Sequence, residues 1–288
     1  MTAHTQSDQK IKLACVQMRS GIDRQQNILA ATSLIEEAAG QGAHFIATPE
    51  MTNVVDRKPD RLFSNLPTIE GLVEVDAFAK LADRLGIWLL IGSMAVKVEG
   101  PGENGRSRAY NRAFLFGPNG QIVARYDKIH LFDVRLPGGE TWQESAIYKP
   151  GEEALVVPTP FAKLGLSICY DVRFPALYRQ MAAKGAQILC VPAAFTRQTG
   201  RAHWETLLRA RAIECMSFVI APAQGGDHED GRETWGHSMI ISPWGEILAE
   251  KKDDHPGIIL AEIDLDEVKK ARERIPSLDL ECPYTVLT

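Results

Sequence analysis

The sequence predicts an α/β protein built as a four-layer α-β-β-α sandwich with an internal pseudo-two-fold symmetry. Helical and extended patterns alternate along the whole chain, which is typical of sheets covered by helices. Two pairs of segments also match in their letters: GAHFIATP (42–49) with GAQILCVP (185–192), and GPNGQIVAR (117–125) with SPWGEILAE (242–250). The spacing of the copies differs, which indicates a loose duplication. Two such halves favour two sheets packed face to face, with helices on their outer faces.

The elements of the first half follow from hydrophobic periodicity. A helix is predicted over 27–40, where apolar residues recur every three or four positions until Gly40. The short buried strand AHFIATPE (43–50) then delivers Glu50 at its end. The same reasoning predicts a helix over 75–85, a strand over 87–96, and two strands around a Pro-Asn-Gly turn within 112–128.

The second half repeats this order. Its predicted helices are 176–185, 203–216 and 266–275, and its predicted strands are 186–195, 217–224, 257–265 and a pair within 237–250. No linker rich in proline, glycine or serine separates the halves. Residues 11–288 are therefore expected to form one domain, preceded by a disordered polar tail over residues 1–10.

Composition and charge narrow the classes of partner. The formal net charge is −5 and the pI is near 5.9, so neither nucleic acid nor an anionic membrane is expected to bind. No apolar run approaches the roughly 20 residues of a spanning helix. The five cysteines include no CxxC pair or zinc-type cluster, which favours free thiols, a cytoplasmic location, and no metal or cofactor. The DHED segment (227–230) is interpreted as a solvated loop and not as a metal site.

Three chemically distinctive side chains stand at predicted strand ends. Glu50 follows TP, Lys128 follows the first hairpin in YDKIHLF, and Cys169 ends the apolar run in KLGLSICYDVRFP. Active residues of α/β proteins gather in the loops at one end of the strands. Taken singly, Cys169 could equally be the last core residue of a strand, and the two charged residues could be ordinary surface groups.

The sequence around these residues resembles the nitrilase superfamily of carbon–nitrogen hydrolases. The resemblance rests on TPEM, YDKIHLFD and ICYDVRFP in this order, and it extends from about Ile11 to Pro276. It implies an α-β-β-α sandwich and a Glu-Lys-Cys triad at Glu50, Lys128 and Cys169. Glu144, in TWQES, matches a second glutamate that in relatives orders the lysine and the substrate.

The chemistry of an amidase suits these residue types. A free thiol has a pKa near 8.5, so a nearby Lys128 ammonium would stabilise the nucleophilic thiolate. Glu50 would take the thiol proton, return it to the leaving amine, and later activate water against the thioester. The resemblance implies that the backbone N–H of Tyr170 joins Lys128 in binding the oxyanion. A strand end at a tight turn would leave the thiol accessible.

The residues after the cysteine narrow the reaction. CYDVRFP and the stretch 194–214 look like the Nit-type amidases, in which two activities compete. One removes a 2-oxoglutaryl group from cysteinylglycine in deaminated glutathione, and the other releases ammonia from 2-oxoglutaramate as an ω-amidase. The stretch 223–245 looks closer to the first, which is the expected activity. Another aliphatic amidase, a nitrilase, or a catalytically idle binding subunit are the further alternatives.

Both candidate substrates carry a carboxylate beside a keto group, so the pocket should contain a cation. Arg173 is the candidate, because guanidinium pairs bidentately with carboxylates; the alternative is that Arg173 only pairs with Asp171. Phe195 and Thr199 match positions that line the acyl pocket in relatives. Ala176 stands where relatives often carry glutamate, and only a small effect on stability is expected from losing that charge near a helix N-terminus.

Two further expectations concern assembly and a rival mechanism. In relatives the region of helix 203–216 packs two protomers together, which implies a homodimer. A cysteine–histidine enzyme with His130 or His237 as the base is the rival mechanism. It would leave Glu50 and Lys128 without a purpose.

Overall fold

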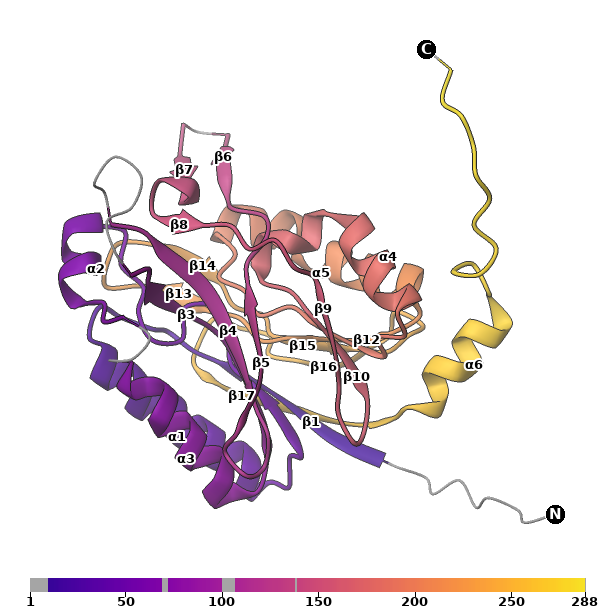
Figure 1. Ribbon diagram of the computed structural model, residues 1–288, viewed down its shortest axis with the longest axis horizontal. Helices are drawn as coiled ribbons and strands as arrows, with labels where there is room; N and C mark the ends of the chain where they lie inside the picture. The colour runs from indigo at the N-terminus through magenta and orange to yellow at the C-terminus, as the bar shows by residue number, and fades with distance from the viewer. Residues whose placement is uncertain (1–9, 69–71, 100–106, 138, 288) are drawn as a thin grey trace.

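The structure is a computed structural model that describes residues 10–68, 72–99, 107–137 and 139–287. Figure 1 shows two sheets between two pairs of helices, with α1 (Arg24–Gly40) and α3 (Val73–Leu85) on one side and α4 (Pro175–Ala183) and α5 (Arg197–Cys215) on the other. The layers are therefore α-β-β-α, as the alternating pattern predicts.

The first sheet contains the strands of the N-terminal half and one late strand: β1 (Lys10–Gln17), β2 (Phe45–Ala47), β3 (Trp88–Lys97), β4 (Ala109–Phe116), β5 (Ile122–Asp127), β8 (Tyr148–Lys149) and β17 (Gly257–Asp264). Their order is β17-β1-β2-β3-β4-β5, with β8 paired to β4. β1, β2 and β3 are parallel, β4 is antiparallel to β3, and β5 is antiparallel to β4, whereas β8 pairs with β4 in parallel.

The second sheet contains β9 (Leu155–Pro158), β10 (Lys163–Leu166), β11 (Ile188–Cys190), β12 (Phe218–Ala221), β15 (Met239–Ile241) and β16 (Ile247–Glu250). Their order is β16-β15-β12-β11-β10-β9. β10, β11 and β12 are parallel, and β15 and β16 follow as antiparallel strands. The directions of β1 to β5 thus recur in this sheet, which confirms the pseudo-symmetry that the repeated letters predict.

The helices cover the outer faces because they connect parallel strands. α1 and α3 join β1 to β2 and β2 to β3, and α4 and α5 do the same for β10, β11 and β12. The Asp23 side chain accepts hydrogen bonds from the first backbone N–H groups of α1, and α3 ends at Gly86, whose φ of 64° suits glycine. The described residues form two further α-helices, α2 (Pro59–Asn65) and α6 (Asp266–Arg274).

Successive side chains along a strand point to opposite faces of the sheet and pack into two separate apolar clusters. In β1, Leu13 and Cys15 enter the core between the sheets, while Ala14 and Val16 pack beneath α1 and α3. A strand with both faces covered must be apolar on both faces. This explains why KIKLACVQ shows a continuous apolar stretch after Lys12 and no strict alternation.

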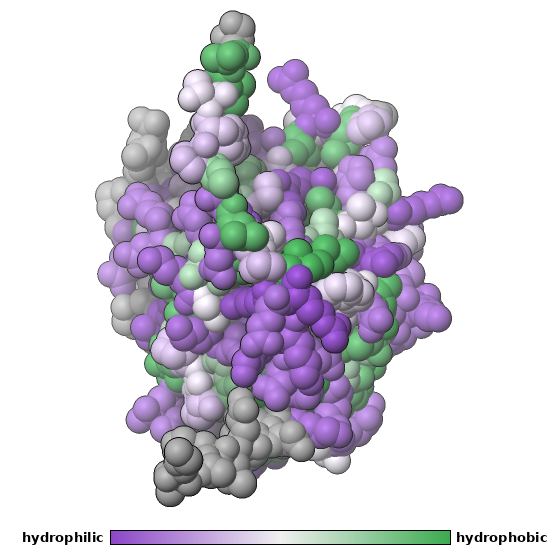
Figure 2. All heavy atoms as spheres, turned by 90° about the vertical axis from the view of Figure 1, so that its right-hand side faces the viewer, coloured by the Kyte–Doolittle hydropathy of each residue, from purple (hydrophilic) through white to green (hydrophobic). Residues whose placement is uncertain are grey.

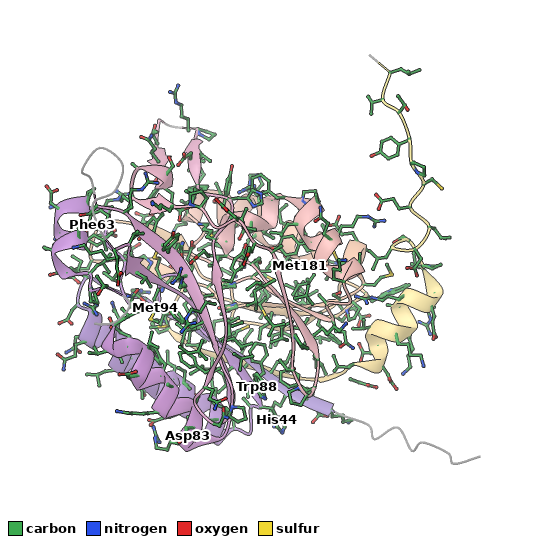
Figure 3. The ribbon with its side chains drawn as sticks, viewed as in Figure 1. His44, Phe63, Asp83, Trp88, Met94 and Met181 are labelled. Carbon is green, nitrogen blue, oxygen red and sulfur yellow. The ribbon has the colours of Figure 1, made fainter. Side chains whose placement is uncertain are left out.

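The parallel strands all run toward one end of the sandwich. At the opposite end, where β2 and β3 begin, the Trp88 N–H donates to the His44 carbonyl oxygen (3.0 Å), and Figure 3 labels both residues there. The carboxyl ends of β2, β10 and β11 are followed by the segments that carry Glu50, Cys169 and Ala194. The topology therefore brings these residues together although they are far apart in sequence.

Several local features differ from the sequence prediction. Residues 1–9 of the expected tail lie outside the described residues, and Lys10 is already the first residue of β1. The prediction over 186–195 is too long, because β11 ends at Cys190. Ala176 is exposed in the first turn of α4, and nothing in the structure explains why alanine stands at this position.

Short elements escaped prediction because they carry too few residues for a period to show. These are α2, β8, β9, and the small hairpins β6 (Asp133–Arg135) with β7 (Thr141–Gln143) and β13 (Gly225–Asp227) with β14 (Glu233–Trp235). None of the helices in the described part of the chain is both long enough and apolar enough to cross a bilayer.

Candidate active site

Glu50, Lys128 and Cys169 line one cavity of about 380 Å³ at the carboxyl ends of the parallel strands. Glu50 lies three residues beyond β2, Lys128 directly follows β5, and Cys169 begins a short 3₁₀ helix (Cys169–Arg173) three residues beyond β10. All three side chains are buried. A cavity of this size falls in the range of small-molecule sites.

The backbone presents the thiol at a constrained turn. Cys169 has a φ of 49°, in the left-handed region, and its N–H donates to the Pro192 carbonyl oxygen at 2.8 Å. Met51, next to Glu50, is also left-handed, with a φ of 56°. Such conformations in residues other than glycine cost about 1–3 kcal/mol and concentrate at functional sites. The apolar strand thus ends before Cys169, and the turn directs its side chain into the cavity.

The Glu50 carboxylate is held by donors from three parts of the chain. Its Oε1 accepts from Lys128 Nζ (2.8 Å) and Asn111 Nδ2 (2.9 Å), and its Oε2 accepts from the Ala194 N–H (2.8 Å). Burial acts to raise the pKa of this carboxyl, but the charge and hydrogen bond of Lys128 outweigh it and lower the pKa. Glu50 is therefore ionised and fixed in position.

Lys128 lies between two carboxylates. Its ammonium donates to Glu50 and also to both oxygens of Glu144, at 3.0 and 2.8 Å. Glu144 is oriented in turn by the Phe132 N–H at 2.6 Å. Burial acts to lower the pKa of Lys128, but the charges of Glu144 and Glu50 outweigh it and raise the pKa well above its usual range. The lysine is a fixed ammonium.

The Cys169 thiol is neutral at rest. Burial and the negative charge of Glu50 raise the pKa of this thiol well above its usual range, and Lys128 offsets them only in part. Lys128 acts to lower the pKa of the thiol, as expected, but burial and the charge of Glu50 together have the larger effect. The arrangement is a neutral thiol beside an ionised base, so the thiol can lose its proton to Glu50 as it attacks a substrate.

Asn111 is a site residue that sequence reasoning missed. Its side-chain N–H₂ donates to Glu50 (2.9 Å) and to Glu144 (3.1 Å), so it joins the two carboxylates that surround Lys128. It is fully buried in β4, among apolar residues. An asparagine within AYNRAFLF, a strand that is apolar over its last four residues, was the available signal, because a buried amide needs partners.

The expected substrate-binding residues lie around the cavity in different ways. Phe195, Thr199 and Tyr170 line it. Arg173 does not; its guanidinium carbon lies 5.3 Å from the ring centre of Phe195 and 5.9 Å from that of Tyr170, behind the cavity wall. Its guanidinium nitrogens approach His203 Nδ1 at 3.3 Å.

The alternative in which Arg173 pairs with Asp171 is wrong. The Asp171 carboxylate is buried, and it accepts from Tyr126 Oη (2.7 Å), from the Ile168 N–H (2.9 Å) and from the His130 N–H (2.9 Å). These bonds join the Cys169 turn to the segment that carries Lys128. The cations that line the cavity directly, besides Lys128, were not anticipated: Arg57 and Arg232.

Comparison with known proteins places this geometry in a family. The family model described as "Carbon-nitrogen hydrolase" matches residues 12–273. The chain belongs to the carbon–nitrogen hydrolase family. A relative from Synechocystis sp., named deaminated glutathione amidase, is 43% identical over 267 residues, which cover 92% of this chain and 96% of the relative. An omega-amidase of Xenopus tropicalis is 36% identical over 267 residues, 93% of each chain.

A solved structure supports the same assignment. The NitFhit protein of C. elegans superposes with a TM-score of 0.87 at 36% identity. The match covers 94% of this chain, which spans 65% of that protein. The α-β-β-α sandwich and the amidase class expected from TPEM, YDKIHLFD and ICYDVRFP are thereby confirmed for this carbon–nitrogen hydrolase.

The histidines of the rival mechanism do not reach the cavity. His130 Nδ1 contacts the Asp171 carboxylate at 2.7 Å, and its ring stacks on Phe174 with centroids 3.5 Å apart. His237 lies beside Glu250, with Nδ1 3.2 Å from the carboxylate, and stacks on Trp235. Neither imidazole lines the space around Cys169. The structure therefore gives no support to a cysteine–histidine pair in this carbon–nitrogen hydrolase.

The DHED segment is only partly the solvated loop that its letters indicate, because Asp227 and Glu229 are exposed but His228 is not. His228 is buried, with Nδ1 2.8 Å from the Ser20 carbonyl oxygen and Nε2 2.6 Å from Thr234 Oγ1. Burial lowers the pKa of its imidazole. A search of the described ranges finds no group of three His, Cys, Asp or Glu side chains arranged to hold a metal ion.

Proposed function

We propose that the chain is a thiol amidase that hydrolyses a small keto-acid amide through a cysteinyl thioester, with Glu50, Lys128 and Cys169 as its catalytic residues. The observation that carries the proposal is the ionised Glu50 carboxylate, buried with the Lys128 ammonium and the neutral Cys169 thiol at one cavity. A base, a fixed cation and a nucleophile are the three groups that acyl transfer requires.

The first half of the reaction forms the thioester. Glu50 takes the proton of the Cys169 thiol as the sulfur attacks the amide carbon. The resulting oxyanion is stabilised by the Lys128 ammonium and the backbone N–H of Tyr170. Glu50 then gives its proton to the amide nitrogen, the carbon–nitrogen bond breaks, and the amine leaves.

The second half returns the enzyme to its resting state. Glu50 takes a proton from water as the water oxygen attacks the thioester carbon. The second oxyanion collapses to a carboxylic acid, and the sulfur leaves and regains its proton from Glu50. Glu144 holds Lys128 in position throughout, because it accepts two hydrogen bonds from the ammonium. Asn111 holds Glu50 and Glu144, because its side-chain amide donates to both carboxylates.

We assign deaminated glutathione as the substrate, cleaved to 2-oxoglutarate and cysteinylglycine. Several curated relatives carry that name, among them one 43% identical to this chain, and arginine and lysine side chains line the cavity. Arg173, unpaired with any carboxylate among the described residues, is proposed to attract the keto-acid carboxylate from behind Tyr170 and Phe195, with Thr199 in contact with the acyl chain.

The second candidate is an ω-amidase acting on 2-oxoglutaramate. It is favoured by the similarity to the Xenopus enzyme, which is 36% identical to this chain, compared with 43% for the Synechocystis relative. Both candidates share the acyl group and differ only in the amine that leaves.

Steady-state hydrolysis of both substrates by wild type and Cys169→Ala tests the proposal. We expect wild type to prefer deaminated glutathione at least about tenfold in kcat/KM, equivalent to about 1.4 kcal/mol of transition-state binding, and Cys169→Ala to be inactive on both. Cys190→Ala, which removes a thiol from β11 outside the cavity, is the matched control and should stay active. A preference for 2-oxoglutaramate would make the chain an ω-amidase, and an active Cys169→Ala would contradict the mechanism.

We also infer a homodimer in the cytoplasm. Ile213 in α5 and Trp244, between β15 and β16, are 51% and 54% exposed. Because a Cβ at Gly245, the residue after Trp244, would lie 2.6 Å from Ile213 Cδ1, we infer that Ile213 and Trp244 belong to one apolar patch. The segment after α6 stands away from the body in Figure 1 and also exposes apolar side chains, some of them green in Figure 2. All five cysteines are free, which suits a reducing compartment.

A further inference from the structure

The cavity has a cationic wall apart from the triad. The guanidinium carbons of Arg57 and Arg232 lie 4.8 and 5.1 Å from the ring centre of Trp142, and all three side chains line the cavity that contains Cys169. They come from the loop before α2, from β7, and from the turn before β14. Contact with the indole face restricts both guanidinium groups.

The acidic residues next to these arginines pair with other cations and leave the positive charge of Arg57 without a carboxylate partner. Asp56 is engaged by Arg61 through two hydrogen bonds, at 2.6 and 2.8 Å. Arg232 is paired with Asp230 at 2.9 Å. Across the described ranges, no carboxylate lies within ion-pair distance of the Arg57 guanidinium.

The other carboxylates of this wall are also occupied. Glu140 accepts a hydrogen bond from the Trp142 indole N–H at 3.0 Å. Glu233 pairs with Arg197 at 2.8 Å. Arg57 therefore presents a positive charge over the face of a flat apolar ring, while the Glu140 carboxylate is bound at the N–H edge of that ring, and a guanidinium placed in this way suits a carboxylate carried on a short chain.

We propose that Arg57, seated on Trp142 beside Arg232, binds the carboxylate of the amine that leaves, and so sets the preference for amides whose leaving group is a peptide-like acid over those that release ammonia. The inference rests on the proposed function, in which the acyl group lies toward Tyr170, Phe195 and Arg173. An amide with a carboxylate at each end needs a cation on both sides of the thiol. 2-Oxoglutaramate carries one carboxylate and has no use for the second cation.

Kinetics on three substrates test this. For Arg57→Gln we expect KM for deaminated glutathione to rise about tenfold or more with kcat little changed, because a charged hydrogen bond made equally in ground and transition states is lost. KM should change less than about twofold for 2-oxoglutaramate and for deaminated glutathione whose terminal carboxylate is a carboxamide. Arg135→Gln, an exposed arginine of the same hairpin as Trp142 that does not line the cavity, is the matched control.

Equal losses on all three substrates, or no loss on any, would overturn the inference. A measurement of substrate binding distinguishes failure of the Arg57 inference from failure of the proposed function. In the Cys169→Ala background, calorimetry should show deaminated glutathione binding about tenfold more weakly after Arg57→Gln, and its carboxamide binding unchanged. This result supports the carboxylate site even if wild type does not turn the compound over, whereas equal binding with and without Arg57 excludes it.

Discussion

The Cys169 thiol is buried beside the Glu50 carboxylate and the Lys128 ammonium, and its burial, followed by the charge of Glu50, decides its protonation state. Burial and Glu50 raise the pKa of the thiol, so the nucleophile forms only when Glu50 removes the proton. Many reactive cysteines work in the opposite way, with a pKa lowered by nearby positive charge. A neutral resting thiol is less open to oxidation and alkylation, since the thiolate is the reactive form.

Replacing Glu50 by glutamine should separate thiol reactivity from catalysis. The change removes the charge that raises the pKa of Cys169, so the pH profile of alkylation by iodoacetamide should move to lower pH. Amide hydrolysis should fall by roughly 10²–10⁴-fold, because the general base is lost. Mass spectrometry of Cys169 alkylation from pH 6 to 10, beside kcat, measures both.

Glu152→Gln, at an exposed glutamate, is the matched control and should change neither the pH profile of Cys169 alkylation nor kcat. An alkylation profile of Glu50→Gln that stays in place or moves to higher pH would mean that Glu50 does not set the pKa of the thiol.

At the scale of elements, β3 carries much of the site although it contributes no catalytic side chain. Its pairing with β4 shifts register between Ile91 and Met94, at Gly92 and Ser93. Ser93 Oγ accepts from the Met51 N–H (2.9 Å), and the Ser93 N–H donates to the Pro49 carbonyl oxygen (3.2 Å), so the irregular part of the strand holds both neighbours of Glu50. Irregular strand positions next to active sites often re-aim a side chain in this way.

Gly92→Ala should destabilise the fold and the site together. A Cβ at this position would lie 2.0 Å from the Thr48 carbonyl oxygen and 2.4 Å from Pro192 Cβ, where the two sheets approach. We expect the free energy of unfolding to fall by about 1–3 kcal/mol or more, and kcat to fall because Pro49 and Pro192 precede Glu50 and Ala194. Urea denaturation and kcat of the folded fraction test this.

Gly40→Ala is the matched control. Gly40 ends α1, and a Cβ there meets nothing within 4 Å, so stability should rise by about 0.5–1 kcal/mol with kcat unchanged. A Gly92→Ala protein as stable and active as wild type would show that β3 does not fix the Glu50 segment.

How far the sequence predicts these elements depends on their length and on what pairs with them. Long helices and strands such as α1 and β3 follow from periodicity, and the repeated letters predict the recurring order of strands. Three-residue strands such as β7 carry no period, so the hairpin that places Trp142 could not be found. Arg57 escaped for a different reason: the residues that make it distinctive, Trp142 and Arg232, become its neighbours only in three dimensions.

At the scale of the whole molecule, the duplication explains where the site forms. The repeated segments 42–49 and 185–192 end at Pro49 and Pro192, which meet around Gly92. The residues that follow them touch, since the Ala194 N–H donates to Glu50 at 2.8 Å. Each half thus supplies one strand end to a shared site. In the proposed mechanism the first half contributes the base and the lysine and the second half contributes the thiol, so neither half would be active alone.

The apolar patch formed by Ile213 and Trp244 leads to the last prediction. If two copies associate through it, light scattering at micromolar concentration should give about twice the chain mass of 31.8 kDa. Ile213→Glu places a charge in the patch and should reduce the mass to that of one chain, since an unpaired charge in an apolar interface is costly. Val123→Glu, at a residue of β5 that is 43% exposed, is the matched control and should remain dimeric. A wild type of single-chain mass would exclude the dimer, and a dimeric Ile213→Glu would mean that the interface lies elsewhere.

Because Ile213 lies in α5, whose first turn contains Thr199 of the cavity wall, loss of the dimer should also raise KM. An unchanged KM in the monomer would mean that each subunit binds substrate independently.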